Sequence, residues 1–186
     1  KVSRESRRED FFGNNVFQFE IQNPHRELVI TATSQVETRP QIVDTNLDLG
    51  STCAEALLKM RQSKSEDVLL AREFQLDSAM IASSNELRNF AQDLFTPDRS
   101  LLSAVSALTE RIFTDFTYSP LSTTIATPIA DVMKNRKGVC QDFAHLQIGC
   151  LRAMGYAAKY VSGYLETLPP PGEEKMVGVD ATHAWL

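Results

Sequence analysis

Cys140 stands at a position where a thiol could do chemistry. It follows Gly138 and Val139, and the apolar periodicity of a helix begins directly behind it. A thiol attacks as the thiolate, and a helix N-terminus or a nearby histidine lowers its pKa. The backbone N–H of Cys140 would point toward an oxyanion formed at its sulfur. Gly138 would let a substrate approach the backbone, and Asp142 could cap free N–H groups, although its negative charge opposes the thiolate.

An inert, buried cysteine is the alternative interpretation, because cysteine is among the most buried residue types. We assign Cys53 and Cys150 to this class, since Cys150 lies on the apolar face of the same helix and Cys53 has no chemistry-bearing neighbours. Cys140 and Cys150 are about 15 Å apart along a helix, which is too far for a disulfide. The three cysteines and three histidines show no ligand spacing, so we expect neither a metal site nor a cofactor.

A thiolate nucleophile also needs a base, and the chain offers three histidines. His25 falls in a proline-bearing loop, where we expect it to be solvated. His145 follows Cys140 by five residues and therefore points about 140° away around the helix. His183 lies in a strand-like run after the helix, and a helix packed on that strand could bring thiol and imidazole together. Cys140 and His183 are thus the candidates for nucleophile and base.

Two aromatic residues could support this pair. The phenol of Tyr118 could donate to an oxyanion, but an aromatic that follows Phe113 and Phe116 is also typical of a core. Trp185, two positions after His183, is expected to shield the imidazole from solvent rather than to act chemically.

Apolar spacing and capping signals predict helices that would position these residues. The predicted helical segments are residues 52–74, 83–95, 100–112, 127–136 and 140–154. Ser83 and Glu86 are read as a capping box, and Thr127-Pro128 as the cap and first residue of the fourth helix. Gly138 suits a left-handed C-cap. The last helix is apolar or small on nearly every side, which indicates a central, buried helix.

Strand-like segments flank the helices. We interpret two of them, Val16–Ile21 and Leu28–Thr33, as a β-hairpin that follows a Gly/Asn turn at residues 11–15. Two later strands are predicted at residues 157–165 and 176–186, and a proline-rich loop separates them. The order of hairpin, helices and strands predicts an α+β fold.

The bulk composition limits the function. The chain has 186 residues, of which 42% are hydrophobic and 23% charged, as in ordinary globular domains. A net charge of −5 argues against nucleic-acid binding, and no apolar run reaches the ~18 residues of a membrane span. Free thiols point to a reducing compartment, so we expect a cytoplasmic protein. Since it lacks an initiator Met and stops inside a strand-like run, we expect a fragment cut at both ends.

Several ordered blocks resemble the bacterial branch of the transglutaminase-like superfamily. The blocks are residues 138–146 (GVCQDFAHL), 151–156 (LRAMGY), 160–164 (YVSGY) and 180–185 (DATHAW), with weaker likeness at residues 10–14 and 116–119. The resemblance implies a papain-like fold, with the nucleophile on a central helix packed on an antiparallel sheet. It also implies that residues 1–40 are the remnant of an N-terminal β-region and residues 41–186 a transglutaminase-like core truncated at its C-terminal end.

The resemblance further implies acyl transfer by a Cys-His-Asp triad, with Cys140 as nucleophile and His183 as general base and acid. The family's aspartate lies on the strand after the histidine, so the third member is not expected in this chain. Asp180 is no substitute, because a residue three positions away on a strand faces the opposite side. An orienting carboxylate is worth about 10⁴ in kcat in comparable triads, so weak or no turnover is expected of this fragment.

These observations predict a cysteine enzyme that cleaves or transfers acyl groups at peptide or protein amides through a thioester. No oxygen-rich calcium loop is present, which favours a hydrolase (a cysteine protease or amidase) over a cross-linking acyltransferase. One alternative is a non-catalytic interaction module on the same fold, which has no physical need for both Cys140 and His183. A structural zinc protein is the remoter alternative and fails on ligand count.

Overall fold

The computed structural model describes residues 4–31, 33, 35–37, 46–120, 122–165 and 182–186 of the chain. The chain divides into two compact units, residues 1–36 and residues 37–186. The first unit contains the hairpin, and the second contains the helices and all the candidate site residues. The α+β prediction is confirmed by this order of elements, although several local boundaries differ from those expected.

The first unit is an antiparallel hairpin of β1 (Arg4–Glu9) and β2 (Asn15–Glu20), with Arg4 opposite Glu20 and Glu9 opposite Asn15. The Asp10 carboxylate closes the turn by accepting the backbone N–H groups of Phe12 and Asn14, each at 2.9 Å.

The expected partner of β2 was wrong, because the described residues between 28 and 33 form no strand and residues 4–9 take that place. The sequence RESRRE of β1 has no apolar alternation, so the period-2 signal that indicates a strand is missing there.

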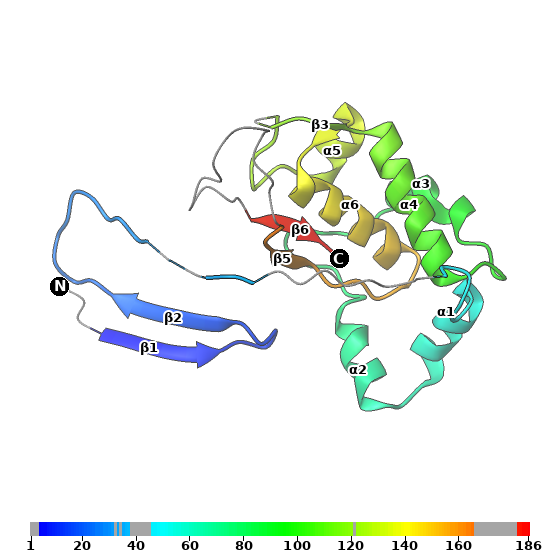
Figure 1. The fold of residues 1–186 in the computed structure, drawn as a ribbon, viewed down its shortest axis with the longest axis horizontal. Helices are drawn as coiled ribbons and strands as arrows, with labels where there is room; N and C mark the ends of the chain where they lie inside the picture. Colours follow the sequence, from blue (N-terminus) through cyan, green and yellow to red (C-terminus); the bar gives the residue numbers. More distant parts are fainter. Residues whose placement is uncertain (1–3, 32, 34, 38–45, 121, 166–181) are drawn as a thin grey trace. The chain divides into compact units, whose positions relative to one another are not determined.

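The second unit consists mainly of helices (Figure 1). Its helical elements are α1 (Cys53–Gln62), α2 (Glu66–Glu73), α3 (Asn85–Ala91), η1 (Gln92–Leu94), α4 (Leu101–Asp115), α5 (Ile129–Asn135) and α6 (Cys140–Ala153). Its strands form two-stranded pairs: β3 (Thr117–Tyr118) is parallel to β4 (Lys137–Gly138), and β5 (Val161–Gly163) is antiparallel to β6 (His183–Trp185).

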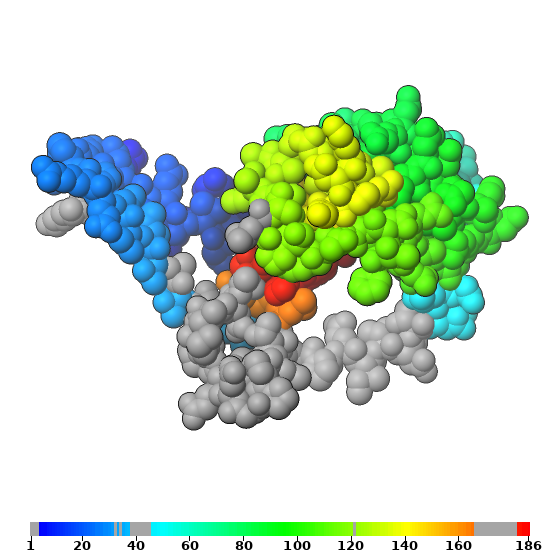
Figure 2. All heavy atoms as spheres, turned by 90° about the horizontal axis from the view of Figure 1, so that it is seen from above, coloured from blue at the N-terminus to red at the C-terminus, as the bar shows by residue number. Residues whose placement is uncertain are grey.

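Helix α6 is the centre of this unit, as the sequence predicted. Most of its residues are buried, and Leu146, Ile148 and Cys150 are fully enclosed. It packs against α3, α4 and α5 and against strand β6. In Figure 2 the green and yellow atoms of the helices form one closely packed body, with the red atoms of β6 beside it. The helix that carries Cys140 is therefore held from several sides.

Two predicted helix starts are shifted by one residue. The N-cap of α3 is Ser84, whose hydroxyl accepts the backbone N–H of Leu87 at 3.2 Å. Ser83, expected as the cap, instead donates to Asp77 at 2.7 Å. At α5, Pro128 is the N-cap rather than the first helical residue.

Segment 52–74 is two helices, and the first starts at a capping box between Thr52 and Glu55 that the periodicity did not reveal.

Gly138 is not the C-cap of α5, contrary to expectation. Arg136 adopts the left-handed conformation there, with φ of 53°, and Gly138 instead lies in strand β4 opposite Tyr118. The Arg136 guanidinium lies over the rings of Phe90 and Phe116, at 5.2 and 4.7 Å from their centroids. These cation–π contacts explain how a non-glycine residue can hold the left-handed position.

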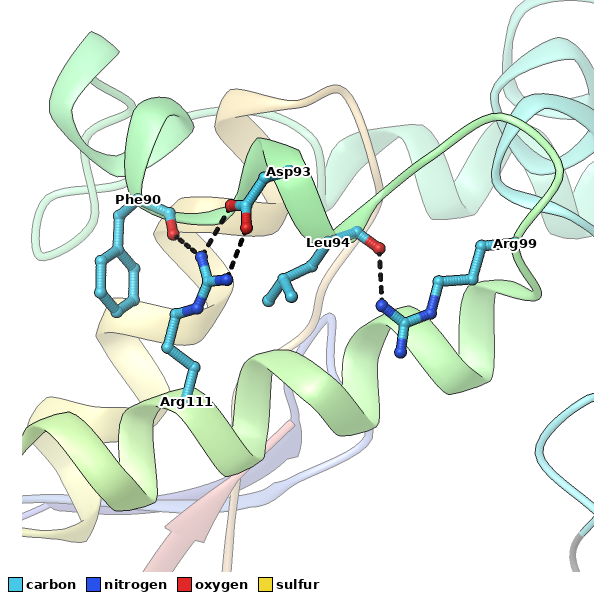
Figure 3. Close-up of polar contacts among 5 residues, drawn as sticks. All are labelled: Phe90, Asp93, Leu94, Arg99 and Arg111. Atoms are coloured by element: carbon cyan, nitrogen blue, oxygen red, sulfur yellow. Dashed lines mark hydrogen bonds and ion pairs between the residues drawn. The ribbon is translucent and has the colours of Figure 1, made fainter.

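An arginine on α4 joins this helix to the end of α3. The Arg111 guanidinium makes a two-pronged contact with the Asp93 carboxylate, at 2.7 and 2.6 Å, and also donates to the Phe90 carbonyl (Figure 3). A second arginine, Arg99, donates to the Leu94 carbonyl at 3.1 Å. Together these contacts bring side-chain donors to carbonyls at the end of α3 and in η1.

Candidate active site

Cys140 is the first residue of α6 and is half-buried. The short strand β4 leads directly into it, and β4 is fixed by its parallel pairing with β3. The Ser119 N–H extends this pairing by donating to the Gly138 carbonyl at 2.9 Å. As the first helical residue, Cys140 has a backbone N–H without a partner in its own helix. The predicted placement of the thiol at a helix N-terminus is therefore confirmed.

The buried carboxylate of Asp142 fixes the first turn of α6. Its Oδ2 accepts the backbone N–H of Val139 at 2.8 Å and the hydroxyl of Thr123 at 2.6 Å. The expected capping role of Asp142 is confirmed, while the contribution of Thr123 was not anticipated. A Cβ on Gly138 would lie 2.8 Å from the Asp142 Cβ, so only glycine fits here without a shift of the helix. Gly138 thus serves the approach of Asp142, and the suggested approach of a substrate to its backbone stays a prediction.

A groove of about 660 Å³ lies beside the thiol. Its walls come from one side of α6, from α4 and Tyr118, and from the end of the chain at β6. The described lining residues are Val105, Thr109, Ile112, Phe113, Phe116, Tyr118, Cys140, Phe143, Ala144, Gln147, Ala184, Trp185 and Leu186. Cys140 is thus reached from the surface through this groove.

His183 begins β6, which packs against α6. The histidine is half-buried and lies opposite Gly163 of β5. The Trp185 indole covers Gly163, since a Cβ built there would meet the ring at 2.6 Å. Three residues of this terminal segment, Ala184, Trp185 and Leu186, line the groove with Cys140, whereas His183 is not among its described lining residues. The structure brings the two elements together, and the thiol–imidazole pair itself stays a prediction.

Tyr118 lies at the groove and is 58% exposed, so it is not the core aromatic that its neighbours suggested. Its role toward an oxyanion stays a prediction. Tyr160, which no spacing argument singled out, is a second phenol near the thiol. Burial and the Cys140 thiol raise the pKa of Tyr160, and its ring lies 5.2 Å from that of His145. Only its place in the block YVSGY could have drawn attention to it.

The other thiols and histidines lie in different surroundings. Cys53 and Cys150 are buried, and burial raises the pKa of Cys150 to about 12. The buried His145 has its pKa lowered by desolvation, against the opposing charge of Asp142. His25 is exposed, with Nδ1 3.0 Å from the Asn23 carbonyl. Asp180, considered as a third group, lies outside the described residues.

Within the described part of the chain, no group of three or more His, Cys, Asp or Glu residues is arranged to hold a metal ion. Among the same residues, no helix combines the length and apolar character needed to cross a membrane.

Comparison with known proteins identifies relatives of both units. The family model described as transglutaminase-like superfamily matches residues 88–186, and that of the bacterial transglutaminase-like N-terminal region matches residues 1–37. An uncharacterized protein of Mycobacterium tuberculosis is 44% identical over 178 residues, which are 95% of this chain and 55% of that protein. An uncharacterized protein of Mycobacterium leprae is 28% identical over 188 residues, covering 100% of this chain and 62% of that protein.

The chain thus spans little more than half the length of the curated relatives it matches. A similar solved structure is that of a "Putative Cysteine Protease" from Cytophaga hutchinsonii, with a TM-score of 0.51 and 29% sequence identity. The likeness covers 65% of this chain and 37% of that one.

Proposed function

Since the chain belongs to the transglutaminase-like superfamily and has its papain-like α+β core, we propose that it acts on peptide or protein amides through a thioester on Cys140. Hydrolysis is the proposed outcome, because the similar solved structure is described as a "Putative Cysteine Protease". Transfer of the acyl group to an amine uses the same thioester and differs only in the acceptor.

The proposed reaction has two stages. The Cys140 sulfur attacks the amide carbonyl carbon and its proton passes to His183, while the backbone N–H of Cys140 stabilises the oxyanion. The carbon–nitrogen bond then breaks, and the amine leaves with the proton from His183. Water next attacks the thioester, giving up a proton to His183, and the carboxylic acid departs as the proton returns to the Cys140 sulfur.

The observation that carries the proposal is the contrast between the thiols. Cys140 stands at a helix N-terminus and opens onto a groove of about 660 Å³. Cys53 also begins a helix, α1, but Cys53 and Cys150 are only 1% and 0% exposed, in the packed interior. Only Cys140 combines a place at a helix N-terminus with access from the groove.

The choice of His183 is supported by the packing of β6 on α6, and by the next three residues, 184–186, which line the groove with Cys140.

Limiting iodoacetamide followed by mass spectrometry tests the nucleophile. We expect Cys140 to be alkylated at least about ten-fold faster than either buried cysteine, because reactivity follows thiolate character and exposure. Equal labelling of the three thiols would overturn the proposal. The test uses the full-length gene product, with Cys140→Ala as the control that must lose the fast phase.

Turnover of peptide amides by the same full-length protein tests the activity. Cys140→Ala and His183→Ala should each abolish release of the amine, whereas Cys53→Ala should leave it intact. Incorporation of a fluorescent primary amine into the acyl product would indicate transfer instead of hydrolysis. Unchanged turnover in Cys140→Ala would favour a non-catalytic role for this fold.

A further inference from the structure

The groove beside Cys140 carries an inference about substrate class, which rests on the proposed function. We propose that it receives a large apolar side chain, aromatic above all, from the residue that supplies the scissile carbonyl. Side chains with a charge, or with the uncharged amide of glutamine, are selected against at the same position.

The first support is the chemistry of the groove wall. The described lining residues include no acidic or basic side chain, and five of them are aromatic: Phe113, Phe116, Tyr118, Phe143 and Trp185. Aromatic rings prefer edge-to-face or offset contact with one another, and the wall already shows this in Phe116 and Phe143, with centroids 5.9 Å apart and planes at 70°. A substrate ring would extend this arrangement.

The second support is the position of the thiol relative to the groove. Cys140, Phe143, Ala144 and Gln147 lie at helical spacings of three, four and seven residues, so they form one side of α6. At about 1.5 Å per residue, this side extends about 10 Å from the thiol along the helix. A carbonyl held at the thiol would therefore place its neighbouring side chain in the apolar part of the groove.

The third support is that two polar groups in the wall, the Gln147 side-chain amide and the Thr109 hydroxyl, already have partners. The Gln147 side-chain amide donates to the Thr109 hydroxyl at 2.7 Å and to the Val105 carbonyl at 3.4 Å. A charged side chain entering this groove would lose hydration without gaining an opposite charge, and an amide side chain would lose hydrogen bonds to water. Such a wall favours apolar over polar side chains, through the cost of desolvating the polar ones as much as through contact with the apolar ones.

The inference is tested with acetylated amino-acid chloromethyl ketones bearing the side chains of phenylalanine, glutamine, aspartate and lysine. Their alkylation rates at Cys140 in the full-length protein, measured by mass spectrometry, are divided by their rates with glutathione to remove intrinsic reactivity. We expect the phenylalanine probe to react at least about ten-fold faster than each of the others, the lower end of pocket discrimination.

A surface variant makes the test independent of folding defects. Phe113 lines the groove yet is 85% exposed, so Phe113→Asp should leave the fold intact. It should reduce the preference for the phenylalanine probe over the lysine probe by about ten-fold. Leu102→Asp is the matched control, because Leu102 is on the same helix, is 48% exposed and is not among the groove-lining residues. The control should keep the preference of the wild type, and thermal unfolding checks both variants.

The outcomes separate the two proposals. If Cys140 is the fast thiol toward iodoacetamide but reacts equally with all four probes, the inference about substrate class is overturned and the nucleophile stands. If Cys140 reacts no faster than Cys53 and Cys150 with any reagent, the proposed function itself is overturned. Equal loss of preference in Phe113→Asp and Leu102→Asp would also contradict the assignment of the groove.

Discussion

Substitution of Gly138 by alanine should disturb both the stability of the protein and the position of its candidate nucleophile. Gly138 is two residues before Cys140, and its neighbour across the start of α6 is the Asp142 side chain. The added methyl group would lie 2.8 Å from the Asp142 Cβ and 2.9 Å from its Oδ2. The Cβ is fixed to the helix backbone, so a change of rotamer does not relieve the contact, and the turn itself must move.

The expected magnitude follows from the contacts that would be lost. The carbon–carbon approach is about 0.7 Å closer than ordinary contact, and overpacking of this kind costs about 1–3 kcal/mol. Displacing Asp142 also weakens its bonds to Val139 and Thr123, and a hydrogen bond to a charged group is worth about 1.5–3 kcal/mol. We therefore expect Gly138→Ala to lower the free energy of unfolding by about 3 kcal/mol.

Urea unfolding and thermal unfolding measure this loss, which corresponds to a fall in Tm of about 6–12 °C for a chain of this size. Gly149→Ala is the matched control. Its added Cβ would lie 2.9 Å from the flexible end of the Leu87 side chain and at ordinary contact distance, 3.6 and 3.7 Å, from Ile81 and Ile129. Alanine also gains about 1 kcal/mol of helix propensity. The free energy of unfolding of this control should remain within about 1 kcal/mol of that of the wild type.

The alkylation rate of Cys140 gives a second measurement on Gly138→Ala, and it should change because the thiol lies at the displaced turn. A variant within about 0.5 kcal/mol of the wild type, with unchanged alkylation, would refute the claim that the approach of Asp142 requires glycine.

Two further predictions concern groups outside the groove wall. The lowered pKa of the buried His145 means that the unfolded chain binds its proton more readily, so stability should fall as pH drops below about 6.5 and level off below the folded pKa. Urea unfolding across pH should show this slope, and His145→Gln should remove it. The Asp93 side chain is 60% exposed, so Asp93→Asn should cost less than about 1 kcal/mol. Arg111→Leu should cost about 1–2 kcal/mol, because the Phe90 carbonyl also loses its donor; equal costs in urea unfolding would contradict this difference.

Those parts of the fold that depend on apolar spacing were predictable from sequence. Helices α4 and α6 follow from their spacing, and the buried character of α6 follows from small residues on its outer sides. Strand β1 was missed because its residues are charged and exposed, so the hydrogen bonds of the hairpin define it rather than any burial. Arg136 was missed because its left-handed conformation depends on two aromatic rings that are distant in sequence.

The candidate site was likewise predictable only where local sequence determines it. Cys140 could be placed at a helix start from local sequence alone, and this is where the structure has it. The contributions of Thr123 and Tyr160 depend on tertiary contacts, across 19 residues to Asp142 in the first case. Neither spacing nor composition encodes such a contact. The function of Gly138 was misread for the same reason, since a cap and a close approach both call for glycine.

The strongest argument for Cys140 is a comparison within a single helix. Cys140 and Cys150 are both in α6, yet they differ in their place along it. Cys150 lies in the second half among buried side chains, where desolvation raises its pKa to about 12 and disfavours the thiolate. Cys140 lies at the N-terminal end, where it is half-buried and lines the groove. The same helix therefore holds one thiol inert and presents the other, which makes Cys150 the internal control for every labelling experiment on Cys140.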